Sequence, residues 1–447
     1  MLLVISVLTT FLLTAFCEEG SIADLFLSED DLETDYRSQQ YAEVKQSLLA
    51  AWQAKTGLEK VWDQLVRKLE KRLEAVKEQS SAGVPVVHFR DIVNNGGKFP
   101  ANVALKVSKK GVVIVRGVLD RKTAVSVEAE LVKYLMDNEA FLAKEEDTVY
   151  EIYWSKAQMR ARTHPNMVKL MQALLSLWRL ENATDMNLSK PLMYVDRFRR
   201  RSPMSRFPLP PHIDGGAAER WTDPEYRAVY RRIFNGSLDE YDPWLADHRH
   251  TANMNTLGHA NGATFFRGFQ GWLSLSSSGP GSGTLKVIPN LQEVTQYLML
   301  RPLLNDVPED ILPGVVPGKT FHLSSKWHSA LTDSLVPIPS VSPGDTVWWH
   351  PDLVHSVEEW NSSAELNSVL YIPAGPDCPA NRNYLRRLRH SLIAKQSPPD
   401  FPSSDKEKDF IGRAMLADLS PVGLEMMGWP ADNRERDEMD QCQAPRV

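Results

Sequence analysis

The sequence predicts an α+β protein in which helices flank an antiparallel β-sandwich or small barrel. Before residue 190, apolar residues recur mostly at helical spacing around one β-branched run, GVVIVRGVL at 111–119. From residue 191 onward, short β-type runs alternate with turns that contain Gly and Pro, a pattern typical of sandwiches and barrels. The 447 residues are enough for one large domain with extensions or for two domains.

The chain opens with an apolar segment at 1–17. This segment has the length of the apolar part of a signal peptide and is too short to span a membrane, but no Lys or Arg precedes its apolar run. It is therefore either a secretory signal or an ordinary apolar N-terminus. The three cysteines have no CxxC spacing, which argues against a disulfide framework or a zinc-thiolate site. This composition favours a cytoplasmic protein and leaves secretion open.

Residues 18–84 are expected to form a helical extension. Between Tyr41 and Glu78 the apolar residues recur at three- and four-residue steps, with a break near Gly57. Small, turn-forming residues at 80–84 end the extension. Further helices are expected at 124–135 and 166–180.

The main domain is expected to cover residues 85–430, followed by a C-terminal tail at 431–447. Its strands are predicted at 192–198, 265–275, 284–288, 346–349 and 368–372, and a basic helix at 383–394. A polar and aromatic insertion at 220–261 interrupts the strands and is interpreted as a functional lid. Its aromatic residues either close a pocket or pack in the core: Trp221, Tyr226, Tyr230, Tyr241 and Trp244.

The charge pattern favours a small-molecule substrate over a polyanionic partner. A net charge of −6 gives no global field that would attract nucleic acid or an anionic membrane. The basic run from Arg197 to Arg206 lacks the aromatic interleaving of nucleic-acid-binding motifs, and it is of more interest as the source of a single buried arginine. We therefore expect neither nucleic acid nor, apart from the possible signal segment, a membrane as partner; the oligomeric state is not predicted.

The motif His212-Ile-Asp214-Gly-Gly is the first candidate metal-binding element. On a strand, residues i and i+2 project from the same face, so one imidazole and one carboxylate can reach one metal ion. The following glycines allow the backbone to turn sharply there. However, His350-Pro-Asp352 repeats the same spacing, so at least one of the two copies must be incidental.

A histidine farther along the chain favours His212-Ile-Asp214 as the metal-binding copy of the motif. A Pro-Gly-Asp turn and a strand at 346–349 lead to His355, the usual approach to the second histidine of a 2-His-1-carboxylate triad. Such a triad of His212, Asp214 and His355 covers one face of an octahedral Fe(II) and leaves three positions for a bidentate 2-oxo acid and O2. His350 is the rival third ligand, and a zinc enzyme uses the same ligand types.

Several stretches between roughly residues 85 and 430 form one specific combination, and they lie at 150–158, 194–201, 211–216, 219–221, 241–244, 269–273, 348–352 and 371–374. In these stretches the chain resembles the YbiU-type family, which is related to N-acetylglucosamine-induced fungal proteins. This resemblance implies a double-stranded β-helix (jelly-roll, cupin-like) core and an Fe(II) and 2-oxoglutarate-dependent oxygenase without a settled substrate.

The residue that binds the distal carboxylate of 2-oxoglutarate is less evident. Many oxygenases of this type carry an arginine about a dozen residues after the distal histidine, where this chain has Asn367-Ser368. Arg267 is the first substitute, because Phe266-Arg267-Gly268 is similar to the strand that supplies a lysine in JmjC-type hydroxylases, and Arg197 is the second. Tyr194 and Asn367 are expected to add hydrogen bonds. The alternatives are a catalytically inactive jelly roll, a cupin-like binding protein and a metal-dependent hydrolase.

Overall fold

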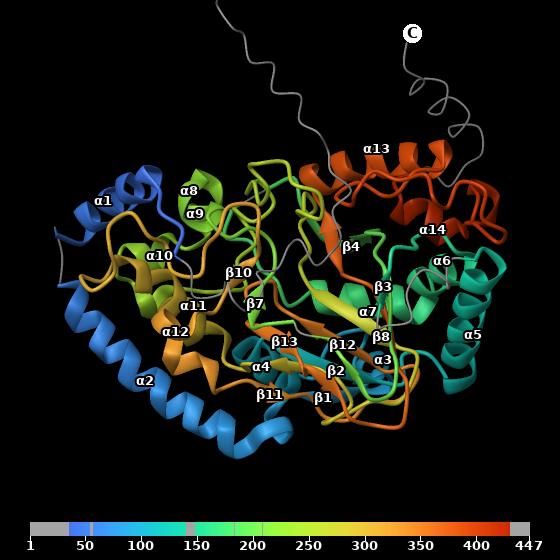
Figure 1. The fold of residues 1–447 in the computed structure, drawn as a ribbon, viewed down its shortest axis with the longest axis horizontal. Helices are drawn as coiled ribbons and strands as arrows, with labels where there is room; N and C mark the ends of the chain where they lie inside the picture. Colours follow the sequence, from blue (N-terminus) through green and yellow to red (C-terminus); the bar gives the residue numbers. More distant parts are fainter. Residues whose placement is uncertain (1–34, 54–56, 140–147, 183, 208, 430–447) are drawn as a thin grey trace, which may run out of the picture.

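The computed structural model describes residues 35–53, 57–139, 148–182, 184–207 and 209–429. The predicted N-terminal apolar segment at 1–17 and the C-terminal tail at 431–447 lie outside these residues. Two larger β-sheets occupy the middle of the molecule and helices surround them (Figure 1). The prediction of a mixed α+β protein is therefore confirmed.

The larger sheet has seven strands, of which β1 and β2 pair in parallel and the others are antiparallel. The inner strand β12 is buried along its whole length, which explains its largely apolar sequence. The strand order is β1 (Val86–His88), β2 (Val112–Arg116), β12 (Thr346–Trp349), β8 (Gln270–Ser274), β15 (Asn367–Tyr371), β5 (Phe198–Arg201) and β3 (Thr148–Tyr150).

The second sheet has five short antiparallel strands. Their order is β10 (Phe321–His322), β7 (His212–Ile213), β13 (His355–Val357), β9 (Leu285–Val287) and β11 (Val336–Pro337). Two strand pairs complete the fold, β14 (Trp360–Asn361) with β6 (Ser205–Arg206) and β16 (Gly375–Asp377) with β4 (Asn187–Leu192). Side chains from both larger sheets line one cavity, so the space between these sheets is where a site can form.

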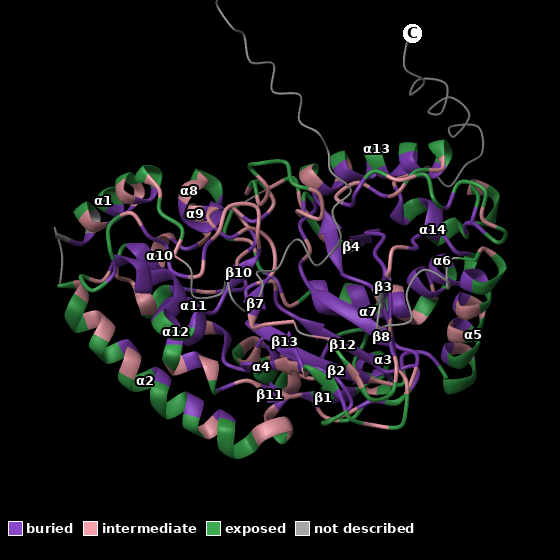
Figure 2. Ribbon diagram, viewed as in Figure 1, coloured by how far each residue is buried: buried purple, intermediate pink, exposed green. Residues whose placement is uncertain are grey.

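The N-terminal helices α1 (Gln39–Gln53) and α2 (Leu58–Gln79) follow the predicted periodicity, and the predicted break is confirmed because Gly57 is the N-cap of α2. Helix α2 buries one stripe and exposes the rest (Figure 2). No helix within the described ranges is long and apolar enough to cross a bilayer. The other helices of the main body are α3 (Phe89–Asn94), α4 (Ala101–Lys110), α5 (Arg121–Asp137), α6 (Lys156–Arg162), α7 (Pro165–Leu175), α11 (Leu291–Leu300), α12 (Ser325–Thr332), α13 (Pro379–Ala394) and α14 (Pro421–Met426).

Two predicted strands are wrong over part of their length. The run at 192–198 is not a strand, since β4 ends at Leu192 and β5 begins at Phe198. The backbone between them does not form a continuous ladder: the N–H of Met193 donates to the carbonyl of Met426, and the Arg162 guanidinium donates to the carbonyl of Asp196. Arg197 therefore precedes β5 and does not stand on a strand.

The predicted strand at 265–275 begins five residues late, at Gln270. The Asn381 side chain takes both backbone groups of Phe266, accepting from its N–H at 2.7 Å and donating to its carbonyl at 3.0 Å. These bonds replace a strand ladder, so Arg267 lies in a loop that leads into β8.

The insertion at 220–261 contains three short helices in its first part, α8 (Glu219–Thr222), α9 (Pro224–Val229) and α10 (Arg231–Phe234), and turns and loops after them. The five aromatic residues that the sequence analysis singled out in it are all buried in apolar clusters. None of them lines the cavity between the sheets in the part of the chain that the structure describes. The packing interpretation therefore holds for these rings, while other residues of the insertion, among them Met254, Asn255 and His259, do line the cavity.

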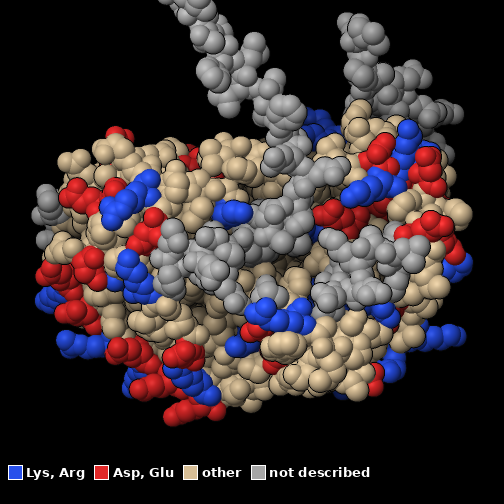
Figure 3. All heavy atoms as spheres, viewed as in Figure 1, with Lys and Arg blue, Asp and Glu red and all other residues tan. Residues whose placement is uncertain are grey.

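Basic and acidic side chains are interspersed over the face shown in Figure 3. The arginines of the 197–201 run, by contrast, are mostly inside the protein: Arg197, Arg199 and Arg201 are buried, and Arg200 is intermediate. This burial makes the run a structural or binding element and not a solvated basic face.

Candidate metal centre

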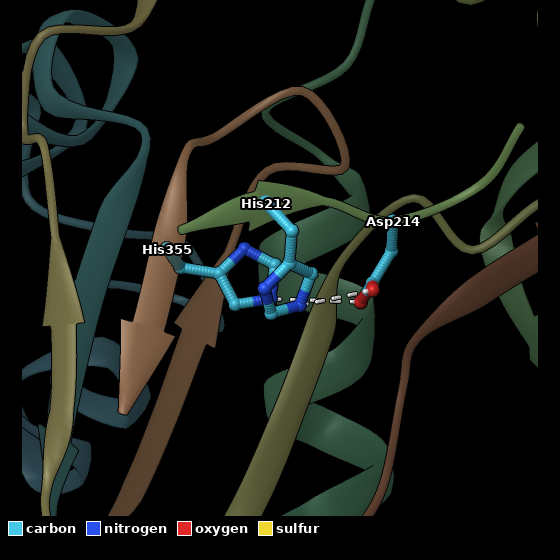
Figure 4. A group of neighbouring side chains, drawn as sticks. All are labelled: His212, Asp214 and His355. Carbon is cyan, nitrogen blue, oxygen red and sulfur yellow. Dashed lines mark ion pairs between the residues drawn. The ribbon is translucent and has the colours of Figure 1, made fainter. Parts of the chain in front are cut away.

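The structure brings His212, Asp214 and His355 together, with one potential ligand atom of each within 4.8 Å of the others. His212 on β7 and His355 on β13 are direct cross-strand partners. Asp214 follows β7 by one residue, and its carboxylate points at the two imidazoles (Figure 4). The cluster therefore arises from one antiparallel pairing plus the two-residue step of the His-x-Asp motif.

Both imidazoles are held in the orientation that a metal ligand needs. Nδ1 of His212 lies 2.7 Å from the carbonyl of Pro210, and Nδ1 of His355 lies 2.9 Å from the carbonyl of Leu353. Carbonyls only accept, so each Nδ1 carries the proton and donates it. Each Nε2 then presents its lone pair, and these atoms lie 3.4 Å and 3.6 Å from the oxygens of Asp214.

The electrostatics of the cluster favour the protonation states of metal ligands. Burial raises the pKa of Asp214 by itself, but hydrogen bonds and charge interactions with the two neighbouring imidazoles more than offset this and hold the pKa well below its usual range. Burial, reinforced by His355, lowers the pKa of His212. The first shift favours an ionised carboxylate and the second favours loss of the imidazole proton, and both groups bind a cation in these deprotonated forms.

The loop after β7 is fixed by backbone geometry and by one arginine. Gly215 and Gly216 have φ of 81° and 74°, and a Cβ on Gly216 would lie 2.9 Å from the carbonyl of Met254. The Arg220 guanidinium donates to the carbonyl of Asp214 at 2.9 Å and to that of Gly216 at 3.1 Å. The loop that carries Asp214 is therefore preorganised and needs glycine at these positions.

Gln270 orients the carboxylate and had not been predicted from the sequence. It is the first residue of β8, is buried, and its Nε2 donates to Oδ2 of Asp214. Its cross-strand partner is Trp349 of β12. This long-range pairing places the amide beside the metal centre, and a polar residue that opens an otherwise apolar strand was the available signal.

Replacing Gln270 with alanine is expected to weaken divalent metal binding by about 10- to 100-fold, the usual effect of losing a partner that orients a ligand. Gln270→Glu should also weaken it at neutral pH, because an ionised carboxylate cannot donate the hydrogen bond that orients Asp214. Titration of the metal-free protein with Mn²⁺, followed by calorimetry, measures both variants. Unchanged affinity in Gln270→Ala would remove Gln270 from the centre.

His350, the rival third ligand, serves a packing role. Its Nε2 lies 3.0 Å from the carbonyl of Pro243 and its Nδ1 accepts from the backbone N–H of Asp352 at 3.0 Å. Its ring stacks on Trp178 and meets Trp244 edge-on. Both nitrogens are thus occupied, and among the described residues His350 belongs to no group that could hold a metal.

The buried neutral state of His350 predicts an acid-sensitive fold. Burial, with Arg249 nearby, lowers its pKa from 6.5 to about 3. Below pH 6.5 this histidine is protonated in the unfolded chain but stays neutral in the folded protein. The free energy of unfolding therefore falls by about 1.4 kcal/mol per pH unit from this group until the folded pKa is reached. Urea unfolding of the metal-free protein at pH 7 and pH 5 should show this loss. In His350→Gln the decrease in the free energy of unfolding between the two pH values should be smaller by the contribution of His350. An identical pH dependence in His350→Gln would contradict the assignment.

The cavity between the sheets opens beside the triad and has an empty volume of about 1180 Å³, counting its solvent-open part. Arg267 lines it half-buried, with its guanidinium over the Tyr194 ring at 5.6 Å. Arg197 also lines it, but its guanidinium is bonded to Asp196 at 3.2 Å and to Asn261 at 3.2 Å. The two predicted arginines therefore share one cavity with the triad. Arg197 is already hydrogen-bonded to two side chains, whereas Arg267 contacts an aromatic ring.

Tyr194 and Asn367 lie outside the described cavity lining. Tyr194 stacks on Tyr384 in the core beneath Arg267. The Asn367 amide donates to the carbonyls of Ser282 and Gly283 at 2.9 and 3.1 Å. The hydrogen bonds expected from these residues to a co-substrate stay predictions, and for Asn367 the amide donors are engaged in holding the turn before β9.

The chain is similar to proteins of bacteria and fungi over most of its length. It is 37% identical over 372 residues to the uncharacterised protein YbiU of Escherichia coli strain K12, covering 80% of this chain and 88% of that protein. The crystal structure of the hypothetical protein JW0805 of Escherichia coli superimposes with a TM-score of 0.82 at 34% identity, over 90% of this chain and 100% of the other.

A fungal structure shares the fold as well. The crystal structure of GlcNAc Inducible Gene 2 (GIG2, DUF1479) of Candida albicans gives a TM-score of 0.80 at 28% identity, over 92% of this chain and 96% of the other. The sequence pattern of the Gig2-like family matches residues 32–429. The resemblance seen in the sequence motifs is thereby confirmed, and the chain belongs to the Gig2-like family.

Proposed function

We propose that this protein is a non-haem Fe(II) and 2-oxoglutarate-dependent oxygenase that acts on a small molecule, and that its two larger sheets form a double-stranded β-helix. One observation carries the proposal: two imidazole Nε2 atoms and one carboxylate converge within 4.8 Å at the edge of a cavity that both sheets line. Two histidines and one carboxylate on one face are the ligand set of this enzyme class.

The residues present fit the metal. His212, Asp214 and His355 would hold it, with both Nδ1 atoms bonded to backbone carbonyls and Asp214 oriented by Gln270. When bound, Fe(II) supplies the chemistry that couples O2-driven decarboxylation of 2-oxoglutarate to succinate and CO2 with oxidation of a substrate C–H bond.

The protein's own contribution is binding, orientation and exclusion of water. The cavity wall beside the triad carries the arginines expected to attract a 2-oxo acid, Arg267 being the less engaged of the two predicted from the sequence. Residues of the insertion cover the side of the cavity next to Gly215 and Gly216. These features would hold an anionic co-substrate beside the metal ligands.

The test is anaerobic reconstitution with Fe(II) followed by titration with 2-oxoglutarate, monitored by the metal-to-ligand charge-transfer absorption. The wild-type protein should develop this band, and His212→Ala should lack it. Succinate release in the presence of a metabolite mixture then searches for the substrate. A wild-type protein that binds Fe(II) but develops no band would contradict the oxygenase proposal and favour a metal-dependent hydrolase or a binding protein.

A further inference from the structure

Arg199 stands on the cavity side of the seven-stranded sheet. It lies on β5 opposite Val369 of β15, and two residues farther along β15 Tyr371 pairs with Trp272 of β8. Cross-strand partners and residues two apart share a face of a sheet. Arg199 therefore faces the same way as Trp272 and Tyr371, and all three line the cavity that contains the triad.

The Arg199 side chain is buried without a partner. The residue is only 4% exposed, its Nε has no hydrogen-bond partner, and no ion pair or hydrogen bond joins its guanidinium to any residue in the described ranges. A buried charge is expensive unless it is paired, and folded proteins rarely retain one without a reason. An unpaired guanidinium that faces a cavity is a binding site for an anion from outside.

The two arginines that follow Arg199 on β5 do have partners. Arg201, on the same face, donates to the carbonyls of Gly283 and Glu358 at 3.1 and 2.7 Å, which fixes the end of the sheet. Arg200 points to the opposite face, where its Nε lies 3.8 Å from Glu128. Structural partners hold both neighbours, whereas Arg199 is held by none.

We propose that Arg199 binds the distal carboxylate of the 2-oxo acid whose other end lies at the His212–Asp214–His355 centre. This inference rests on the proposed function and adds the residue that would select a dicarboxylic co-substrate. A guanidinium presents parallel N–H donors that match a carboxylate, and burial strengthens the pair. The lining of the same cavity includes Leu285, Val357 and Trp272, whose apolar surfaces suit the methylene groups of a short acid.

Arg199 and Arg267 differ in how deeply their side chains are buried. Arg267 is half-buried in the loop before β8 and already rests on the face of Tyr194, whereas Arg199 is buried on a strand. Strand positions hold a side chain more rigidly than loop positions do. This difference predicts that charge removal at Arg199, and not at Arg267, abolishes recognition of the distal carboxylate.

The experiment compares two co-substrates that differ only at the distal end: 2-oxoglutarate, and 2-oxopentanoate, in which a methyl group replaces the distal carboxylate. Dissociation constants are measured anaerobically with Fe(II)-loaded protein, by the charge-transfer absorption and by calorimetry. Wild type should bind 2-oxoglutarate at least about 30-fold more tightly, the effect of one buried charge pair. Arg199→Gln should bring this ratio close to one by weakening 2-oxoglutarate alone, and Arg199→Lys should give an intermediate ratio.

Arg200→Gln is the matched control, because it removes the adjacent arginine of the same strand from the opposite face, and it should keep the wild-type ratio. The melting temperature of metal-free Arg199→Gln should equal or exceed that of wild type, since the replaced charge has no partner. A lower melting temperature would assign Arg199 a structural role and overturn the inference. So would a wild-type ratio in Arg199→Gln, or a ratio that collapses in Arg267→Gln instead. Failure of wild type to bind either acid would instead overturn the proposed function.

Discussion

Replacing Asp214 with alanine is expected to weaken Fe(II) binding by more than about 100-fold, beyond the effect of losing a residue that only orients a ligand. Asp214 supplies the sole carboxylate of the cluster, and its oxygens lie 3.4 and 3.6 Å from the two imidazole Nε2 atoms. Without it, two neutral histidines remain, and the site loses the negative charge and the oxygen donor that a divalent cation such as Fe(II) or Mn²⁺ needs for tight binding. Calorimetric titration with Mn²⁺, and with Fe(II) under anaerobic conditions, measures the loss.

His259→Ala provides the control for this prediction. His259 lines the same cavity but does not belong to the described cluster of potential ligands, so its removal should leave metal affinity within about twofold. The metal-free Asp214→Ala protein should melt close to wild type, because the bonds from Arg220 to the backbone carbonyls of residues 214 and 216 stay in place. Wild-type affinity in Asp214→Ala, or a comparable loss in His259→Ala, would contradict the assignment of the centre.

Part of this arrangement could be predicted because it follows from local patterns. The strand at 346–349 was predicted with the bounds that the structure shows, since an inner strand buried on both faces has a largely apolar sequence. The proximity of His212 and Asp214 followed from the two-residue repeat of a strand. His355 required only that a second strand lie beside the first, which the antiparallel pairing of β13 with β7 provides.

Other features depend on long-range pairing that no local pattern contains. Gln270 reaches Asp214 because β8 pairs with β12, strands separated by more than seventy residues of sequence. The alternation in Phe198-Arg199-Arg200-Arg201 does predict that Arg199 and Arg201 share a face. Which of the two is paired depends on the carbonyls of Gly283 and Glu358, which come from elsewhere in the chain.

The two His-x-Asp motifs show how surroundings decide chemistry. Asp214 is open to the cavity and faces two imidazoles, whereas Asp352 is fully enclosed between two guanidinium groups. Arg220 lies 2.7 Å from Oδ1 of Asp352 and Arg249 lies 2.6 Å from Oδ2, and Tyr230 donates to Oδ1 at 2.8 Å. The same spacing therefore yields a candidate metal ligand in one copy and a buried ion cluster in the other.

Asp352→Asn is accordingly expected to lower the free energy of unfolding by about 3–5 kcal/mol, the usual cost of removing one partner from a buried ion pair. The variant keeps the size of the side chain but leaves two buried guanidinium groups without a counter-charge. Burial alone raises the pKa of Asp352, yet Arg249 and Arg220 hold it far below its usual range, so the carboxylate is charged at every pH at which the protein is stable. Chemical denaturation at pH 7 measures the change.

Asp310→Asn is the matched control for this substitution, since it removes a carboxylate from the solvent-exposed pair with Arg37 and should cost at most about 1 kcal/mol. Asp352→Asn should also weaken metal binding, because Arg220 joins Asp352 to the carbonyl of Asp214 and so fixes the loop that carries the ligand. Equal stability of the two variants would mean that the ion cluster does not support the fold. Loss of stability with unchanged metal affinity would show that the cluster holds the insertion without positioning Asp214.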